Sequence, residues 1–576
     1  MIGMRTGAVL ALALLVAADP QDLLVGQAEV GKRGGRVVIA LRSEPKTFNP
    51  VSATDGSSRD VYGRMNANLI RINRETQKTE PALAKAWSVS KDGLRYTLQL
   101  RRGLRFSDGA PFDADDVVFT WQAYLDEKNR SPHREQLIVG GKPIGVKKLD
   151  AYTVVFELQQ PYAVGERLFD GIAMLPRHLL QKAQDEGKLA EAWGLNVAPT
   201  QIAGLGPFRL KAFAPGERVV LERNPNYWKT DRAGQRLPYL DELTFLAVAS
   251  EDAQVIRFQA GDTDMISRVG AENFAVLEKD AKARGYALQD LGPGLEYTFL
   301  FFNLGDLAGK GLDATARRQA WFKDAGFRRA VSAALDRVGM ARLAFGGRAT
   351  PLGSHVTPGN KLWVDASLQA PAQSPQRARE LLKASGFSWK NDGTLQDAKG
   401  QPVEFSLITN SSNAARVKMA TIVQDDLRAL GIKVNLAPLD TSAVIDRVLK
   451  TRDYEACILA FGSGDADPNV EMNIWLSSGA SHLWNPAQAQ PATPWEAELD
   501  RLMRAQVAAL KYDERKKLYD RVQQIVAEQL PMIPLVGPRI LVGAKTGLGN
   551  FRPAILDHYT LWNADELFWR SPPASR

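Results

Sequence analysis

The stretch from Pro81 to Trp121 reads P-A-L-A-K-A-W-S-V-S-K-D-G-L-R-Y-T-L-Q-L-R-R-G-L-R-F-S-D-G-A-P-F-D-A-D-D-V-V-F-T-W. Apolar and polar side chains alternate from Tyr96 to Arg101, which predicts a half-buried β-strand. Asp113 is suited to cap a helix, and Asp115 and Asp116 suit its first turn because the helix dipole favours negative charge there. The stretch therefore predicts a strand followed by a helix, and it accounts for these acids without an active site.

Longer motifs run through this stretch and on either side of it. A-x-x-W-x-x-S-x-D-G-x-x-Y-T-x-x-L-R-x-G covers Ala84–Gly103, and F-x-D-G-x-P-F-x-A-D-D-V-V-F-T-W covers Phe106–Trp121. S-E-P-K-T-F-N-P lies upstream at Ser43–Pro50, and E-R-N-P-N-Y-W lies downstream at Glu222–Trp228. Together these motifs resemble the bacterial extracellular solute-binding proteins of the family 5 type, the peptide and nickel receptors of ABC importers.

The resemblance implies an α/β fold of two lobes, the large type of periplasmic binding protein with an extra subdomain in lobe I. Mixed sheets flanked by helices are expected, with a ligand cleft between the lobes. The implied segments are a signal peptide at 1–28, lobe I at 35–296 with an inserted subdomain at about 82–200, lobe II at 297–538, and a return to lobe I at 539–576. A chain of 576 residues is long enough to require more than one core.

Two segments of the expected second lobe carry further predictions. Phe327–Arg337 resembles a helix of the family, and its Val331, Leu335 and Val338 have the spacing of one helix face. Ala456–Phe461 is a short apolar run of strand length, which predicts a buried strand that contains the only cysteine, Cys457.

Composition excludes several classes of function. Lys and Arg number 73 against 65 Asp and Glu, and the net charge of +8 is spread without a basic block, so no nucleic-acid partner is expected. One cysteine excludes an internal disulfide and a cysteine-based metal site. The five histidines lie far apart without metal-ligand spacing, so neither a metal nor a cofactor is expected.

The N-terminal segment predicts export. Arg5 provides a basic start, and an apolar run over Gly7–Val16 is short for a membrane span. Small residues favour cleavage near 18 or 28, and no cysteine follows the run, so lipid attachment is not expected. The expected location is the periplasm, and an uncleaved membrane anchor is the alternative.

Resemblance to the family also implies the residues that line the cleft. The second-lobe wall follows the strand at 456–461, where Gly462–Asp467 precede Pro468 in a turn that lies beyond a strand end, as ligand sites in α/β sheets do. The family's peptide receptors hold the ligand ammonium with an aspartate four residues before the proline, where this chain has Gly464, and Asp465 is the candidate replacement. The expected ligand-binding residues are Ser43, Glu44, Thr47, Phe461, Gly462, Ser463, Gly464, Asp465 and Asp467.

No catalytic motif is present in the sequence. It lacks a G-x-S-x-G elbow, an H-E-x-x-H pair and a complete P-loop, so an enzyme is not expected. The function implied by the family is a monomeric receptor that captures a peptide or peptide-like solute and delivers it to an inner-membrane ABC permease. Oligosaccharides and other polar solutes remain alternative ligands, and a periplasmic hydrolase or a peptide-holding chaperone remain alternative classes.

Overall fold

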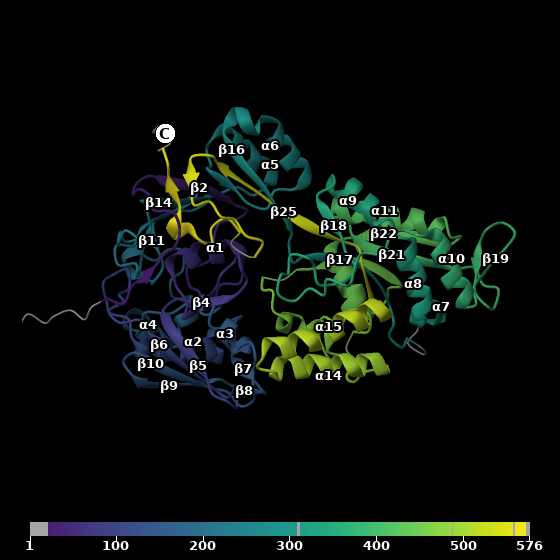
Figure 1. The fold of residues 1–576 in the computed structure, drawn as a ribbon, viewed down its shortest axis with the longest axis horizontal. Coiled ribbons are helices and arrows are strands. Elements are labelled where there is room, and N and C mark those ends of the chain that lie inside the picture. Colours follow the sequence, from purple (N-terminus) through teal and green to yellow (C-terminus); the bar gives the residue numbers. More distant parts are fainter. Residues whose placement is uncertain (1–20, 308–311, 463, 487, 557–558, 572–576) are drawn as a thin grey trace, which may run out of the picture.

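A computed structural model of the chain describes residues 21–307, 312–462, 464–486, 488–556 and 559–571. Figure 1 shows two lobes side by side, joined by strand β25 (Val536–Lys545), which crosses between them. The main sheet of lobe I takes its strands from residues 36–293 and 536–545, with a short strand from 349–351, and the sheet of lobe II takes its strands from residues 297–534. The two-lobe α/β fold with mixed sheets is thus confirmed.

The main sheet of lobe I is mixed. Strands β2 and β14 are parallel, and β12, β11 and β16 pair with their neighbours in antiparallel fashion. In spatial order its strands are β11 (Phe208–Ala214), β12 (Arg218–Arg223), β14 (Glu242–Ala247), β2 (Arg36–Leu41), β15 (Met265–Ile266), β25 and β16 (Tyr286–Pro293), and β18 (Ala349–Pro351) of lobe II also pairs with β25. The helices outside the subdomain are α1 (Gly56–Met65), α5 (Glu251–Ala260) and α6 (Ala271–Arg284).

A second sheet forms the subdomain of lobe I. Its four antiparallel strands, in order, are β5 (Ala84–Val89), β6 (Arg95–Leu100), β10 (Thr153–Glu157) and β9 (Gly145–Asp150). Its helices are α2 (Ala114–Leu125), α3 (Gly165–Leu168) and α4 (Arg177–Asp185), and a small hairpin of β3 (Ile70–Ile72) and β4 (Thr79–Pro81) lies nearby. The buried side chains of this subdomain belong to the same hydrophobic core as the main sheet, so the two sheets are packed as one lobe.

Lobe II is built on a five-stranded mixed sheet. Its strands, in order, are β22 (Lys433–Leu439), β21 (Glu404–Asn410), β23 (Ala456–Phe461), β17 (Tyr297–Phe302) and β24 (Met532–Pro534). Every residue of β17 is buried, because alternate side chains enter separate cores on the two faces of the sheet. The main helices are α7 (Asp313–Lys323), α8 (Ala325–Ala334), α9 (Arg337–Phe345), α10 (Pro375–Ala384), α11 (Ala414–Arg428), α12 (Thr441–Ile445), α13 (Met472–Trp475), α14 (Pro494–Ala508) and α15 (Tyr512–Gln529).

Two extended connections join the lobes. One runs from the end of β16 at Pro293 to the start of β17 at Tyr297, and the other runs from β24 into β25 through Leu535. The second is tied to β17, because the backbone N–H of Leu535 donates to the carbonyl of Thr298 at 2.9 Å. Short connections of this kind can act as a hinge, since a change in a few backbone angles can move one lobe against the other.

The predictions for the opening stretch are confirmed. The strand is β6, and the helix is α2 with Asp113 as its N-cap. The Asp113 carboxylate accepts from the N–H of Asp115 at 2.8 Å, and the Asp116 carboxylate accepts in return from the N–H of Asp113 at 3.1 Å. This reciprocal capping box satisfies the first donors of the helix.

The predictions for lobe II had a mixed outcome. Strand β23 spans Ala456–Phe461 as expected, and Cys457 is buried. The proposed face of Val331, Leu335 and Val338 is wrong, because α8 ends at Ala334 and Val338 is 69% exposed. Asp336 caps a new helix, α9, by accepting from the N–H of Gly339 at 2.7 Å, so Val338 lies on a different axis from Val331.

The part of the chain that is described contains no helix long and apolar enough to cross a membrane. The expected signal peptide falls largely within residues 1–20, which lie outside the described residues.

Candidate ligand-binding cleft

A cavity of about 720 Å³ at the predicted turn lies between the two lobes. This size is within the range of small-molecule sites. Its lobe I wall comes from the subdomain and the β3 hairpin, and its lobe II wall comes from β17, the end of β23 and the turn that follows. Residues on the two walls include Ile72, Tyr162, Arg167 and Asp170 from lobe I and Tyr297, Phe461, Gly462, Gly464, Asp465, Asp467, Asn469 and Glu471 from lobe II.

The aromatic side of the lobe II wall is fixed by packing within the sheet. Phe461 ends β23, and its ring lies 5.0 Å from that of Phe299 and 6.1 Å from that of Tyr297, both on the neighbouring strand β17. Phe461 remains only partly buried because it lies at the edge of the cavity. It therefore offers an apolar face to a ligand without needing a ligand to hold it in place.

An ion pair crosses the cleft at Asp465. Arg167 on α3 donates from Nε to Asp465 Oδ2 at 2.8 Å, and its second guanidinium nitrogen contacts the other carboxylate oxygen. Arg167 also donates to the carbonyl of Gln77 at 3.0 Å. Burial by itself would lower the pKa of Arg167, but Asp465 and the acids nearby raise that pKa on balance, so the guanidinium stays charged. The pair joins the lobes with two parallel, charge-assisted bonds.

Other polar contacts also cross between the lobes. Asn469 donates from its side-chain amide to the hydroxyl of Tyr162 at 2.6 Å, and the N–H of Ala163 donates to the carbonyl of Val507 at 2.8 Å. The side chain of Gln77 donates to the carbonyl of Gly359 at 2.8 Å. These contacts join the two lobes across the cavity.

Asp467 has a different environment from Asp465. Its side chain is buried, and its two oxygens accept from the guanidinium of Arg515 on α15, each at 2.9 Å. Asp467 Oδ1 also accepts from the N–H of Asn469 at 3.0 Å and so caps the 3-10 turn at Pro468–Glu471. Arg515 in turn lies over the ring of Trp363 at 4.7 Å. Asp467 thus fixes the turn to the helix behind it.

A second, smaller cavity of about 290 Å³ adjoins the first. The two share the lining residues Ile72, His133, Asp170, Gly171 and Gly464. The smaller cavity is rich in arginine, and it is lined by Arg59, Arg64, Arg71 and Arg74.

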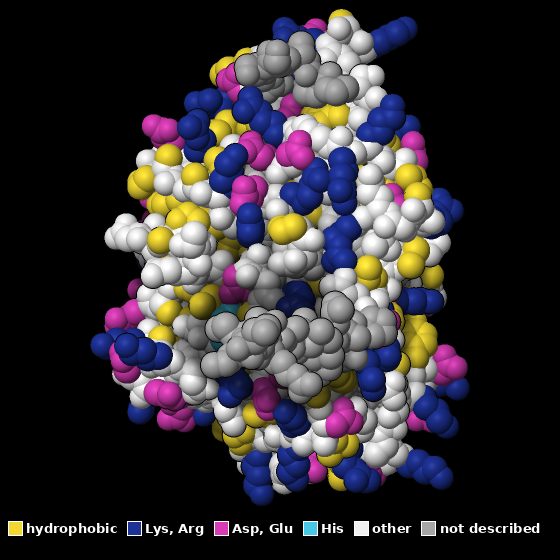
Figure 2. Space-filling view, turned by 90° about the vertical axis from the view of Figure 1, so that its left-hand side faces the viewer, with side chains coloured by type: hydrophobic (Ala, Val, Ile, Leu, Met, Phe, Trp, Pro, Cys, Tyr) yellow, Lys and Arg dark blue, Asp and Glu magenta, His cyan; other side chains and the backbone are white. Residues whose placement is uncertain are grey.

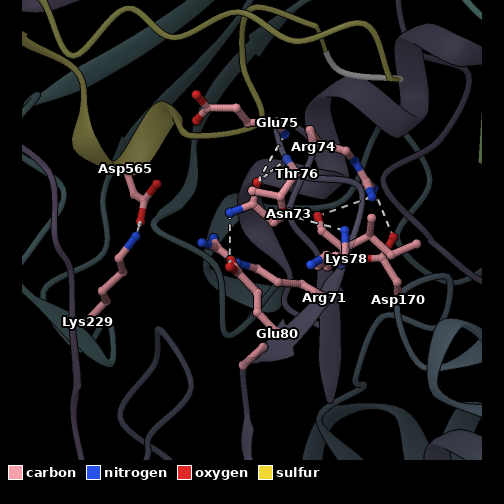
Figure 3. A network of polar contacts seen from close by, with 12 residues as sticks. Arg71, Asn73, Arg74, Glu75, Thr76, Lys78, Glu80, Asp170, Lys229 and Asp565 are labelled. Carbon is pink, nitrogen blue, oxygen red and sulfur yellow. Dashed lines mark hydrogen bonds and ion pairs between the residues drawn. The ribbon is translucent and has the colours of Figure 1, made fainter. Parts of the chain in front are cut away.

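Figure 3 shows how two of these arginines are held, together with a buried pair next to them. Arg74 pairs with Asp170 at 2.8 Å, and Arg71 pairs with Glu80, which also accepts from Asn73 at 3.0 Å. Lys229 reaches Asp565 at 2.8 Å. Ion pairs therefore hold the charged side chains of this cavity wall in place.

Comparison with known proteins gives the family of the chain. The sequence profile described as "Bacterial extracellular solute-binding proteins, family 5 Middle" matches residues 78–482. The chain belongs to this family.

Individual relatives cover most of the chain. The oligopeptide-binding protein AppA of Bacillus subtilis is 24% identical over 532 residues, which are 90% of this chain and 89% of that protein. The glutathione-binding protein GsiB of Salmonella typhimurium is 26% identical over 517 residues, 89% of this chain and 91% of that protein. The ABC transporter substrate-binding protein CtaP of Listeria monocytogenes has the same fold, with a TM-score of 0.75 at 23% identity, and the match covers 94% of this chain and 100% of that structure.

Within this family 5 fold, the predicted lobe II residues mostly meet at the cavity. Phe461, Gly462, Gly464, Asp465 and Asp467 all line it. Ser463 lies outside the described residues.

The predicted lobe I residues lie elsewhere. Ser43, Glu44 and Thr47 line neither of the two cavities. The hydroxyl of Ser43 lies 2.9 Å from that of Ser57, Glu44 accepts from the N–H of Gly216 at 2.8 Å, and Thr47 accepts from the N–H of Asn49 at 3.0 Å. These contacts organise the loop that follows β2.

Sequence reasoning missed the residues that complete the two walls. Tyr162 and Arg167 belong to the inserted subdomain, and no motif marks them. Glu471 lies three residues after Pro468, and the capping of the turn by Asp467 was the signal that could have placed it at the cleft.

The face of lobe I that Figure 2 shows carries charges of both signs. In Figure 2, Lys and Arg side chains are interspersed with Asp and Glu over the face of lobe I that is in view. A mixed surface of this kind does not favour nucleic acid, which is bound by clustered positive charge.

Proposed function

We propose that the protein is the extracellular receptor of an ABC importer, that it captures a peptide or peptide-like solute between its lobes, and that it passes the solute to a membrane permease. The names of its relatives support a peptide-like ligand, since they include an oligopeptide-binding and a glutathione-binding protein. Export by an N-terminal signal peptide is part of this proposal.

The observation that carries the proposal is the cavity of about 720 Å³ whose walls come from both lobes. A ligand in this cavity contacts both lobes only when they are closed, so its binding favours closure. The hinge connections at 294–296 and at Leu535 are short enough to allow such a motion without unfolding either sheet.

The composition of the cleft suits a polar ligand with some apolar character. Phe461 provides an apolar surface, while Gly462 and Gly464 leave their backbone accessible to a ligand. Peptides can use such backbone groups as an added strand does. We propose Phe461, Gly462 and Gly464 as ligand contacts on the lobe II wall.

Native mass spectrometry of the protein purified from its exporting host tests the proposal. We expect a co-purified small solute at a ratio of one to one. After the solute is removed and added back at about one hundred times its Kd, it should stabilise the fold by about 2.7 kcal/mol.

The recovered solute also separates the alternatives. An intact solute supports the receptor, whereas a solute converted to product at catalytic rates would refute it and favour a hydrolase. Binding of many unfolded chains without a small solute would favour a chaperone.

A further inference from the structure

Among the described residues, Glu471 is the acid on the wall of the large cavity that has no Lys or Arg partner, and its ion-pair contact is with the imidazole of His355. The other three carboxylates pair with guanidinium groups, Asp170 with Arg74, Asp465 with Arg167 and Asp467 with Arg515. Glu471 Oε2 instead accepts two neutral hydrogen bonds, from the hydroxyl of Tyr519 at 2.6 Å and from Nε1 of Trp475 at 2.8 Å. Its side chain is 15% exposed.

The surroundings of Glu471 do not supply a positive charge. His355 Nε2 lies 3.5 Å from Oε2, but burial lowers the pKa of His355 to about 3, so this imidazole is neutral. Burial also raises the pKa of Glu471 itself. A buried carboxylate without a cation is costly, and a cation brought by a ligand would remove that cost.

A second polar group next to Glu471 also lacks a partner. Tyr297 lines the same cavity and is 2% exposed, and its hydroxyl has no hydrogen-bond partner among the described residues. Its pKa is raised by burial and by the nearby charge of Glu471. Buried hydroxyl groups are rarely left unpaired, so this group and Glu471 together indicate a ligand with hydrogen-bond donors.

The adjoining smaller cavity contains a buried positive charge, the guanidinium of Arg64. Arg64 lines it and is 5% exposed, and its guanidinium donates to the carbonyl of Leu561 at 3.0 Å. No ion pair joins Arg64 to a carboxylate within the described part of the chain. Burial lowers the pKa of Arg64 to about 10, and it is still charged at neutral pH. It has donors to spare for an anion.

One continuous lining connects Glu471 with Arg64. The large cavity holds Glu471 and the small one holds Arg64, and they share Gly464 of lobe II and four residues of lobe I. A solute that fills both cavities therefore meets a negative pole in lobe II and a positive pole in lobe I.

We propose that the receptor binds a zwitterionic solute, a short peptide with both termini free, with its ammonium group against Glu471 and its carboxylate against Arg64. This inference rests on the proposed function as a peptide receptor. It places the ammonium at a carboxylate other than Asp465, which is occupied by Arg167.

Each pole can be tested by changing the receptor and the ligand together. The probe is an equimolar synthetic library of tri- to pentapeptides made of Ala, Leu, Ser and Phe, so that only the termini carry charge. It is prepared in three forms, with free termini, with an acetylated N-terminus and with an amidated C-terminus. Bound peptides are read by native mass spectrometry, and the affinity of the best binder is measured by calorimetry.

We expect Glu471→Gln to weaken the free peptide by at least about tenfold, because a hydrogen bond to a charged group is lost. The same variant should not weaken the acetylated peptide further. Arg64→Met should also weaken the peptide with free termini by at least about tenfold. It should not weaken the amidated peptide further. The control Glu166→Gln, on α3 but outside both cavities, should leave all affinities unchanged.

The outcomes separate the inference from the function on which it rests. If wild-type protein binds all three forms equally, the proposed contacts of the two peptide termini are wrong, but the proposed function as a peptide receptor is still supported. This result does not depend on the folding of any variant. If Glu471→Gln fails to weaken the amidated peptide further but does weaken the acetylated peptide, Glu471 contacts the carboxylate end, and the proposed orientation of the peptide is wrong. If no free peptide binds, both the proposed peptide ligand and the inference fail.

Discussion

Replacing Arg167 by Met should open the receptor by removing the ion pair with Asp465. The pair joins α3 of lobe I to the turn after β23 in lobe II, so it exists only when the lobes are closed. The two side chains are 12% and 23% exposed, which leaves the pair partly shielded from water. Its loss should therefore act on the closed state and leave the open state unchanged.

The size of the effect follows from the geometry. A hydrogen bond to a charged group contributes about 1.5–3 kcal/mol, and partial exposure reduces this to about 1–2 kcal/mol for the pair. Since ligand binding includes closure, this loss should weaken ligand affinity by about 5- to 30-fold.

A double-mutant cycle with Arg167→Met and Asp465→Asn measures the pair directly. We expect a coupling energy of about 1–2 kcal/mol in calorimetric ligand binding, with a larger radius of gyration of the ligand-free variants in X-ray scattering. The exposed pair Arg377–Glu380 on α10 is the control, and its cycle should give no more than about 0.5 kcal/mol.

Two results would refute this reasoning. Coupling below about 0.5 kcal/mol would show that the pair contributes nothing to closure. An increase in affinity on Arg167→Met would show that Asp465 is the ammonium anchor after all, because removal of its partner would free it for the ligand. In that case Asp465→Ala should abolish binding of peptides with a free amino terminus.

Three further predictions concern stability and access. The pKa of Glu471 is raised in the folded state, so its contribution to stability is present at low pH and is lost as the pH rises. Glu471→Gln should therefore raise the Tm near pH 8 and leave it unchanged near pH 4 in scanning calorimetry. An unchanged Tm at both pH values would contradict a buried charge. Lys229→Met should destabilise lobe I by about 3–5 kcal/mol in denaturant unfolding, because buried Asp565 loses its cation while Glu566 keeps Arg552; a loss below about 1 kcal/mol would place that site within reach of solvent. Cys457 should react with a thiol reagent only after unfolding, since burial raises its pKa; rapid labelling of the native protein would show that β23 opens.

The sequence predicted those parts of the fold that depend on local patterns. The alternation in β6 and the capping acids of α2 are set by neighbouring residues, and both were confirmed. The apolar run of β23 was sufficient to place the strand, although only its first half is buried and Leu459, Ala460 and Phe461 are partly exposed. The break between α8 and α9 was missed because the apolar spacing of Val331, Leu335 and Val338 continues past it. Asp336 nevertheless caps a new helix at that point.

The cleft was predictable only on one side. The turn after β23 follows the strand in sequence, so its position at the cavity could be inferred from the strand alone. Arg167 is 298 residues away from Asp465, and nothing local marks it as a partner. The pairing depends on how the subdomain lies against lobe II, which is set by packing over the whole chain.

The pairing of Asp465 also determines what the ligand must provide. Arg167 neutralises Asp465, which lies one residue after the position at which the family resemblance implies the ammonium anchor. Closure by this pair alone would leave Glu471 buried with only neutral donors, which opposes the closed state. A solute with a cation next to Glu471 would remove the cost of burying its carboxylate, whereas a neutral solute would not. The ion pair and Glu471 therefore act in opposite directions, and the proposed zwitterionic ligand would stabilise the closed state by supplying the missing cation.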